Sequence, residues 1–222
     1  MYTVVNMIWE DILSFIFPER CIGCGREGSA LCAICERAIT TKAKALSGTT
    51  AILFDYQQPL VKKAIWALKY HRRRALGRYF GTALYREFFK QLIKGGKHLG
   101  EEIILLPIPA NKKALASRGY NHAAIIAETI VKCGKADGMR ISAPRNVLYK
   151  KKEVLQQVKA RGRVKRAQNV ANAFDIRDGE KLFGKTVILI DDVITTGATM
   201  SEARRVVRVW KPKRILALAV AH

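Results

Sequence analysis

Residues 187–199, VILIDDVITTGAT, constrain the fold of this chain more than any other segment. The apolar run at 187–190 continues through Val193 and Ile194 on the far side of two acids. Such a run is typical of a strand that is buried on both faces of a parallel sheet. Ligands of open parallel sheets bind outside the carboxyl ends of their strands. The segment therefore predicts a buried strand and a binding site directly after it.

The loop after the acids is a candidate phosphate site, formed by Thr195, Thr196, Gly197, Ala198 and Thr199. Hydroxyls, free backbone N–H groups and the positive end of a helix that we expect to begin near Met200 converge there. Asp191 and Asp192 cannot bind the same phosphate, because carboxylates need hydroxyls, a cation or a proton. A ribose 5-phosphate would satisfy both groups of residues, because its phosphate can bind the loop and its hydroxyls can bind the acids. The alternative is an ordinary strand end followed by a helix cap.

This pattern resembles the PRPP-binding signature of type I phosphoribosyltransferases at all thirteen positions. The resemblance implies that Asp191 and Asp192 hold the ribose hydroxyls, that the loop holds the 5-phosphate, and that Mg²⁺ bridges hydroxyls and pyrophosphate. In 6-oxopurine salvage enzymes the position of Thr195 is an Asp that serves the purine ring. The absence of that carboxylate disfavours simple purine salvage, and the sequence indicates no nucleobase pocket.

Four cysteines near the amino end form two CxxC pairs: Cys21, Cys24, Cys32 and Cys35. Each pair can place two thiolates on one ion, so the spacing predicts a tetrahedral Zn²⁺ site. A closed shell of four thiolates leaves no position for water, which makes the zinc structural. A pair of disulfides is the alternative, although nothing else in the sequence indicates an oxidising compartment.

The composition indicates a folded protein with a polyanionic partner. A chain of 222 residues with 49% hydrophobic residues can fill a sizeable core, and the formal net charge is +22. So high a charge is unusual for a metabolic enzyme and makes nucleic acid the first candidate partner. No apolar stretch reaches the ~20 residues that span a bilayer. Glu10 and Asp11 also argue against a signal peptide. We expect a soluble, cytoplasmic protein.

The positive charge is concentrated in two segments. Residues 62–78 hold seven basic residues and no acid, and residues 140–166 hold ten against Glu153 alone. Either segment alone can be a solvated surface. As candidates for contacts to DNA we take Arg72, Arg73, Arg74, Lys150, Lys151, Lys152, Arg161, Arg163, Lys165 and Arg166. Tyr70, His71, Tyr120 and Tyr149 lie beside such residues and are candidate stacking platforms, or half-buried core aromatics.

The hydrophobic pattern predicts alternating strands and helices. Helices are expected at 7–17, 59–70, 75–94, 121–133 and 159–171, and from the signature loop to 210. Strands are expected at 51–56, 102–108, 146–149, 187–194 and 214–221, and residues 40–50 are expected to be a linker. We therefore predict two units, a helix and four-cysteine zinc module at 1–48 and a phosphoribosyltransferase-like domain at 49–222. The fold class is α/β, Rossmann-like, with a mostly parallel sheet flanked by helices.

The chain as a whole resembles the ComF family, which includes the competence protein ComFC and its GntX relatives. The matching segments are FPERCIGCG at 17–25, FDYQQPL with AIWALKYH within 54–71, LLPIP at 105–109 and RGYNH at 118–122, with spaced matches between 148 and 174. His122, Lys150 and Val154 stand where the family commonly has Gln, Arg and Thr. The histidine is interpreted as a packing residue, although it can also donate a hydrogen bond or titrate.

The resemblance implies a role in natural transformation, in which the protein handles incoming single-stranded DNA with a competence helicase and DNA-loading proteins. Three hypotheses stay open: a PRPP-binding accessory protein of DNA uptake, an active phosphoribosyltransferase on a small or nucleic-acid acceptor, and a PRPP-sensing regulatory module without turnover. If the domain is catalytic, cations must face the departing pyrophosphate. Arg118 is the first candidate, Lys69 the second, and no general base is evident.

Overall fold

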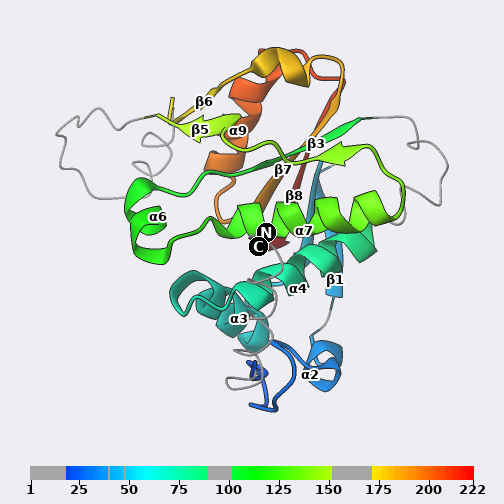
Figure 1. Ribbon diagram of the computed structural model, residues 1–222, viewed down its shortest axis with the longest axis vertical. Helices are drawn as coiled ribbons and strands as arrows, with labels where there is room; N and C mark the ends of the chain where they lie inside the picture. The colour runs from blue at the N-terminus through cyan, green and yellow to red at the C-terminus, as the bar shows by residue number, and fades with distance from the viewer. Residues whose placement is uncertain (1–18, 40, 48, 90–101, 152–171) are drawn as a thin grey trace, which may run out of the picture.

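The core of the protein is a six-stranded sheet with the strand order β1-β2-β8-β7-β3-β4. A computed structural model describes residues 19–39, 41–47, 49–89, 102–151 and 172–222 (Figure 1). Neighbouring strands of the sheet are parallel, except that β1 and β2 are antiparallel. The strands are β1 (Thr41–Ser47), β2 (Thr50–Phe54), β3 (Ile103–Pro107), β4 (Ile141–Ser142), β7 (Thr186–Val193) and β8 (Arg214–Ala221).

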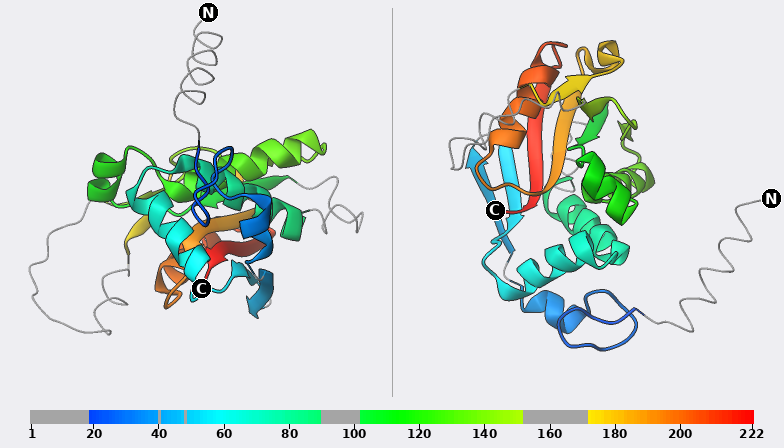
Figure 2. Two further views of the ribbon diagram at one scale, coloured as in Figure 1. Left: turned by 90° about the horizontal axis from the view of Figure 1, so that it is seen from below. Right: turned by 90° about the vertical axis from the view of Figure 1, so that its left-hand side faces the viewer.

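Helices cover both faces of this sheet. One face carries α3 (Pro59–Tyr70), α4 (Arg74–Leu84), its π-helical continuation η1 (Tyr85–Phe89) and α7 (His122–Ala136). The other carries α9 (Ala198–Arg208), the hairpin of β5 (Leu148–Lys150) and β6 (Phe174–Ile176), and the short 3-10 helix η2 (Gly179–Leu182). Figure 2 (right) shows the green helices on one side of the strands and the orange α9 on the other.

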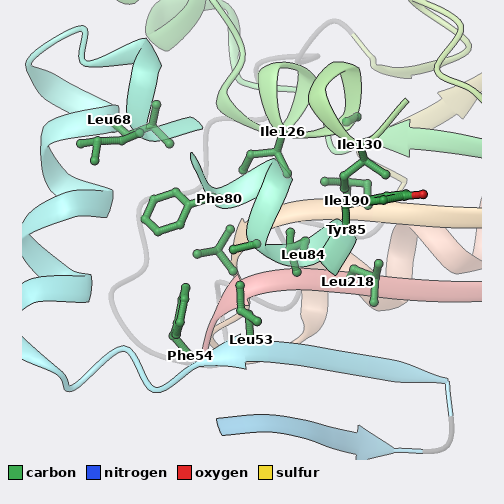
Figure 3. Close-up of a cluster of buried hydrophobic side chains, with 14 of the residues drawn as sticks. Leu53, Phe54, Leu68, Phe80, Leu84, Tyr85, Ile126, Ile130, Ile190 and Leu218 are labelled. Carbon is green, nitrogen blue, oxygen red and sulfur yellow. The ribbon is translucent and has the colours of Figure 1, made fainter. Parts of the chain in front are cut away.

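The period of two along the central strands divides the buried side chains between two cores. On β7, Ile188 and Ile190 face α4 and α7, whereas Val187 and Leu189 face α9. Figure 3 shows Ile190 and Leu218 of the first core among the side chains of Leu84, Tyr85 and Ile126. Because both faces of β7 are buried, its residues 187–190 are continuously apolar and do not alternate with polar residues.

The chain reverses direction across the sheet between β3 and β7. From β3 it continues through α7 to β4 on one side, and from β7 it continues through α9 to β8 on the other. The two helices lie on opposite faces, so the loops that follow β3 and β7 diverge and leave a crevice at the carboxyl edge. This topological switch point is where an open α/β sheet binds its ligand.

Close packing of α4 on α7 depends on small residues. A Cβ atom on Gly81 would lie 2.6 Å from the Cβ of Thr129 and 2.8 Å from the carbonyl oxygen of Ile126. Gly77, one turn earlier, faces Ile125 in the same way. The two glycines therefore let the helix backbones approach, which positions α7, whose first residue lies at the carboxyl edge of the sheet.

The comparison with the expected elements confirms the fold class and corrects several details. The mostly parallel sheet with helices on both faces is as predicted, and β8 has the predicted bounds. The expected linker at 40–50 is wrong, because residues 41–47 form β1, which pairs with β2. Helix α6 (Lys112–Arg118) and strands β4 and β6 were not expected. Expected helices at 7–17 and 159–171 lie outside the described residues.

No helix in the described ranges has the length and apolar character needed to cross a bilayer.

Candidate functional site

The two acids of the signature lie at the carboxyl end of β7 and have different surroundings. Asp192 is 7% exposed. Its Oδ1 lies 2.9 Å from Nζ of Lys69, and its Oδ2 lies 3.6 Å from Nδ1 of His122. The carboxylate of Asp191 accepts a hydrogen bond from the backbone N–H of Asp192 at 2.8 Å. The structure therefore places Lys69, which the sequence predicts to be a binding residue, directly beside the acid pair.

Three elements far apart in the sequence supply these groups. Lys69 lies in the last turn of α3, and His122 is the first residue of α7. Asn121 caps α7 through its side-chain oxygen, which accepts from Ala123, and its amide donates to the carbonyl of Ile108 after β3. This cap fixes the beginning of α7 at the end of β3, and thereby holds the imidazole of His122 against Asp192.

Burial and repulsion shift the protonation of Asp191. Burial, together with the charge of Asp192, raises the pKa of Asp191 to about 7, although the Asp192 N–H and Lys69 oppose the shift. Burial also lowers the pKa of His122, which the charge of Asp192 opposes and the charges of Arg118 and Lys69 reinforce. The imidazole is therefore neutral at pH 7, with one nitrogen as donor and the other as acceptor.

Arg118 ends α6 and completes the cationic side of the crevice. One of its guanidinium nitrogens lies 3.5 Å from Nε2 of His122, and its Cζ lies 4.7 Å from the ring centroid of Tyr70. The next residue, Gly119, has φ of +79°, in the left-handed region, so a glycine permits the turn between α6 and α7. Arg118 and Lys69 thus converge on one site from different helices.

The loop from Thr195 to Thr199 lies beside the acids and leads into α9. Gly197 is the N-cap residue of α9, and its φ of +75° lies in the left-handed region that disfavours other residues. The helix begins at Ala198, two residues before the predicted position. Its first turn contains no acid, so the helix dipole favours an anion there. The N–H of Ala198 donates to Oγ1 of Thr196 at 3.4 Å. Asp191, Thr195, Thr196, Gly197 and Thr199 line one small hollow there.

The described DNA-contact candidates have different surroundings. Arg73 is drawn inward: it donates to Glu19 at 2.7 Å and to the carbonyl of Arg20. Arg72 donates to the carbonyl of Ser117, and Arg74 stacks on Tyr120. Lys151 pairs with Asp175, and Lys150 ends β5. The candidates Lys152, Arg161, Arg163, Lys165 and Arg166 lie outside the described residues.

The four amino-terminal cysteines form a compact cluster whose sulfur atoms all lie within 4.8 Å of one another. All are free thiols. The Sγ atoms of Cys24 and Cys32 are 3.7 Å apart. Thiolates arranged tetrahedrally at about 2.3 Å around Zn²⁺ would be about 3.8 Å apart. The Cys32 N–H donates to the sulfur of Cys21 at 3.3 Å, an interaction that favours a thiolate. The cluster therefore fits a structural zinc ion.

Backbone hydrogen bonds lower the pKa of Cys21, which favours metal binding by this cluster. Burial raises the pKa of Cys21, but hydrogen bonds from the backbone of Cys24, Cys32 and Gly23 outweigh it and bring that pKa to about 6. The neighbouring Cys21 sulfur and burial raise the pKa of Cys35. A hydrogen bond from the backbone of Cys35 also lowers the pKa of Cys32. Binding of a divalent cation by all four sulfurs would require each of them to be deprotonated.

The comparisons with known proteins agree with this description. Residues 114–222 match the phosphoribosyl transferase domain family. Residues 114–222 therefore resemble a phosphoribosyl transferase domain, and β7, the acid pair, the loop and α9 all lie within them. No curated protein matches the chain in sequence.

Solved structures of low identity resemble it in part. A hypoxanthine phosphoribosyltransferase from Staphylococcus aureus is 14% identical with a TM-score of 0.39, over 64% of this chain and 62% of that one. A hypoxanthine-guanine phosphoribosyltransferase from Bacillus anthracis is 15% identical with a TM-score of 0.37, over 64% and 66%. The chain thus spans less than two thirds of the length of either protein.

The sequence indicates that His122 is a packing residue, and the structure buries it, at 5% exposure. However, it contacts Asp192 and Arg118 at the centre of the site. The signal available in the sequence was its position directly after Asn121, since the first residue of a capped helix that follows a strand lies at the carboxyl edge of the sheet.

We predict that Asp191→Asn stabilises the protein increasingly as the pH rises. The folded-state pKa near 7 exceeds the ordinary value near 4. The wild-type protein therefore loses stability from this group as the pH rises from about 4 through 7. We expect the Tm of the variant to exceed that of the wild type by several degrees at pH 8, at about 2–4 °C per kcal/mol, and the gap to narrow toward pH 5.

Thermal unfolding followed by circular dichroism at pH 5, 6.5 and 8 measures this difference. Asp192→Asn is the matched control, and it should lower the Tm at pH 8, because it leaves Lys69 without its carboxylate partner. A gap between Asp191→Asn and the wild type that is the same at all three pH values would contradict the assignment.

We also predict one zinc ion per chain, measured by elemental analysis of protein purified without chelator. Cys24→Ser with Cys32→Ser should abolish zinc binding and lower the Tm, since the metal contributes directly to folding of such modules. Cys133→Ser, at a thiol outside the cluster, should keep the metal. Zinc-free wild-type protein would overturn the site.

Proposed function

We propose that this crevice binds PRPP or a related phosphoribosyl ligand. The observation that carries the proposal is the position of the acid pair beside a glycine-capped helix start at the switch point of the sheet. Asp191 and Asp192 would accept hydrogen bonds from the ribose hydroxyls. Thr195, Thr196, Gly197, Ala198 and Thr199 would hold the 5-phosphate, through backbone N–H groups and hydroxyls.

The cationic side of the crevice suits the pyrophosphate. Lys69 lies 2.9 Å from Asp192, and Arg118 lies beside His122, so both can reach an anion held near the acids. Mg²⁺ prefers carboxylate and phosphate oxygens, and the carboxylate of Asp191 next to a bound pyrophosphate fits that preference. When bound, Mg²⁺ would neutralise charge on the departing pyrophosphate. The chain's own part is to orient the ribose and to place Lys69 and Arg118 over the leaving group.

We predict that Asp191→Asn with Asp192→Asn weakens PRPP binding about a hundredfold or more, because two charge-assisted hydrogen-bonding groups are lost at about 1.5–3 kcal/mol each. Calorimetric titration with PRPP and Mg²⁺ measures the change. Glu180→Ala, which removes an exposed acid beyond the opposite edge of the sheet, is the control. Unchanged PRPP affinity in the double variant would refute the proposal.

Release of pyrophosphate from PRPP then separates two functions of the domain. Release that depends on an added base or nucleic-acid end supports an active phosphoribosyltransferase. Tight binding without release supports a PRPP-sensing module.

As a second function we propose that the protein handles single-stranded nucleic acid. The net charge of +22 supports this, because a small sugar phosphate needs few of these cations. In this proposal the chain is a ComF-like accessory protein of natural transformation in the cytoplasm, acting with a competence helicase and DNA-loading proteins. The zinc-binding unit of residues 1–48 would accompany a phosphoribosyl unit of residues 49–222, with β1 pairing onto the larger sheet.

We predict that affinity for a single-stranded oligonucleotide falls steeply with salt, with a log–log slope of about −0.7 for each phosphate that the protein neutralises. Fluorescence anisotropy over a series of salt concentrations measures the slope. The same titration with a short polyphosphate serves as a control for charge alone. A flat salt response of the oligonucleotide would exclude the nucleic-acid function.

A further inference from the structure

The outer face and C-cap of α3 carry exposed aromatic rings, tilted by 48° and 57° to one another, that lead out from the candidate site. Trp66 and Tyr70, one helical turn apart, have ring centroids 5.5 Å apart, and Trp66 lies 4.6 Å from His71. The guanidinium of Arg118 lies over Tyr70 at the inner end. We call Trp66, Tyr70 and His71 the aromatic ladder.

The ladder is exposed because α3 buries its other face. Val61, Ala64, Ile65 and Leu68 pack into the core, and Lys69 turns toward the acid pair. Trp66 remains 53% exposed and Tyr70 57% exposed. Single exposed hydrophobic residues are ordinary on a protein surface. Two large aromatic rings side by side form an apolar patch, and its exposure to water costs free energy unless a partner covers it. Such patches mark binding sites.

The surroundings of the ladder are basic. Between residues 59 and 74 the chain has Lys62, Lys63, Lys69 and three consecutive arginines, and it has no acid. Lys69 and Arg73 are paired with Asp192 and Glu19, whereas Lys62, Lys63 and Arg72 are exposed. These exposed charges would not favour an apolar segment of another protein. A polyanion with flat, apolar faces is favoured on both counts, and a single strand of nucleic acid combines a phosphate backbone with unpaired bases.

We propose that the aromatic ladder is the platform on which unpaired bases of single-stranded nucleic acid stack, with Lys62, Lys63 and Arg72 facing the phosphates. The inference rests on the proposed nucleic-acid function and assigns it a surface. The strand bound there reaches the phosphoribosyl site, because Arg118 contacts Tyr70 on one side and His122, the neighbour of Asp192, on the other. A strand end or base would thus arrive beside the ribose.

The test compares single aromatic deletions on two probes of about twelve nucleotides, a length within the usual site size of such proteins. One probe is a dye-labelled oligothymidylate, and the other is an abasic strand that keeps the phosphates and lacks bases. Trp66→Ala and Tyr70→Ala should each weaken oligothymidylate binding, by about 5-fold to 150-fold, the range that corresponds to loss of one stacked base. Both variants should bind the abasic strand as the wild type does.

The controls separate stacking from charge and from folding. Phe183 is an exposed ring, 66% exposed, that lies just before β7, at the end of the strand away from the acid pair. Phe183→Ala should bind both probes as the wild type does. Tyr70→Phe keeps the ring and should keep the affinity. The salt slope of Trp66→Ala should equal that of the wild type, whereas Lys62→Ala with Lys63→Ala should make it shallower, by about 0.7 for each phosphate left unneutralised. Trp66→Ala should keep the PRPP affinity.

Distinct results would overturn the inference and the function it rests on. If the wild type binds the oligonucleotide with a steep salt slope, and both aromatic deletions bind it equally well, the ladder is not the platform, although nucleic-acid binding stands. If the deletions weaken binding of both probes equally, the rings do not contact bases. If the wild type binds neither probe, the nucleic-acid function and the ladder fail together.

Discussion

The ion pair between Lys69 and Asp192 joins the helical layer to the central sheet, and the candidate site depends on both. Lys69 ends α3, which belongs to the helical layer, and Asp192 ends β7 at the middle of the sheet. The Lys69 side chain is 26% exposed and that of Asp192 is 9% exposed, so the pair is well shielded from water. Removing one partner of such a pair leaves an uncompensated charge, which costs more than the pair contributes. The same contact holds the last turn of α3 beside the acid pair, and Tyr70 of that turn contacts Arg118.

A chain of hydrogen bonds connects the cysteine module to this region. Arg73, in the corner between α3 and α4, donates to Glu19 and to the carbonyl of Arg20 in the module. The adjacent Arg72 donates to the carbonyl of Ser117, which precedes Arg118. A zinc ion that orders the module would thus order the corner of α3 and the turn that carries Arg118. The contacts of the module therefore extend to the helix ends that carry Lys69 and Arg118.

Much of the fold was predictable because buried strands and helices have recognisable apolar patterns in the sequence. The continuous apolar run of β7 and the run of β8 identified the central strands, and the 3.6-residue period identified α3 and α7. The segment of residues 41–47 left a weaker record. It is an edge strand that pairs on one side with β2, and its small and polar residues resemble a linker. Pairing with a distant part of the chain, which decides its structure, has no local signature.

The candidate site was predictable where its members are adjacent in the chain, and less so where the fold assembles them. The acids and the loop lie within nine residues, 191–199, so one motif identified them. Lys69 and His122 reach Asp192, and Arg118 reaches His122, only because α3, α6 and α7 end or begin at the same edge of the sheet. Arg73 shows the converse: it lies between two arginines in the sequence, yet the fold turns it into the protein toward Glu19. Charge counted along a sequence therefore overstates what a ligand meets, whereas the rings of α3 remain on the surface because the opposite face of that helix is fully used by the core.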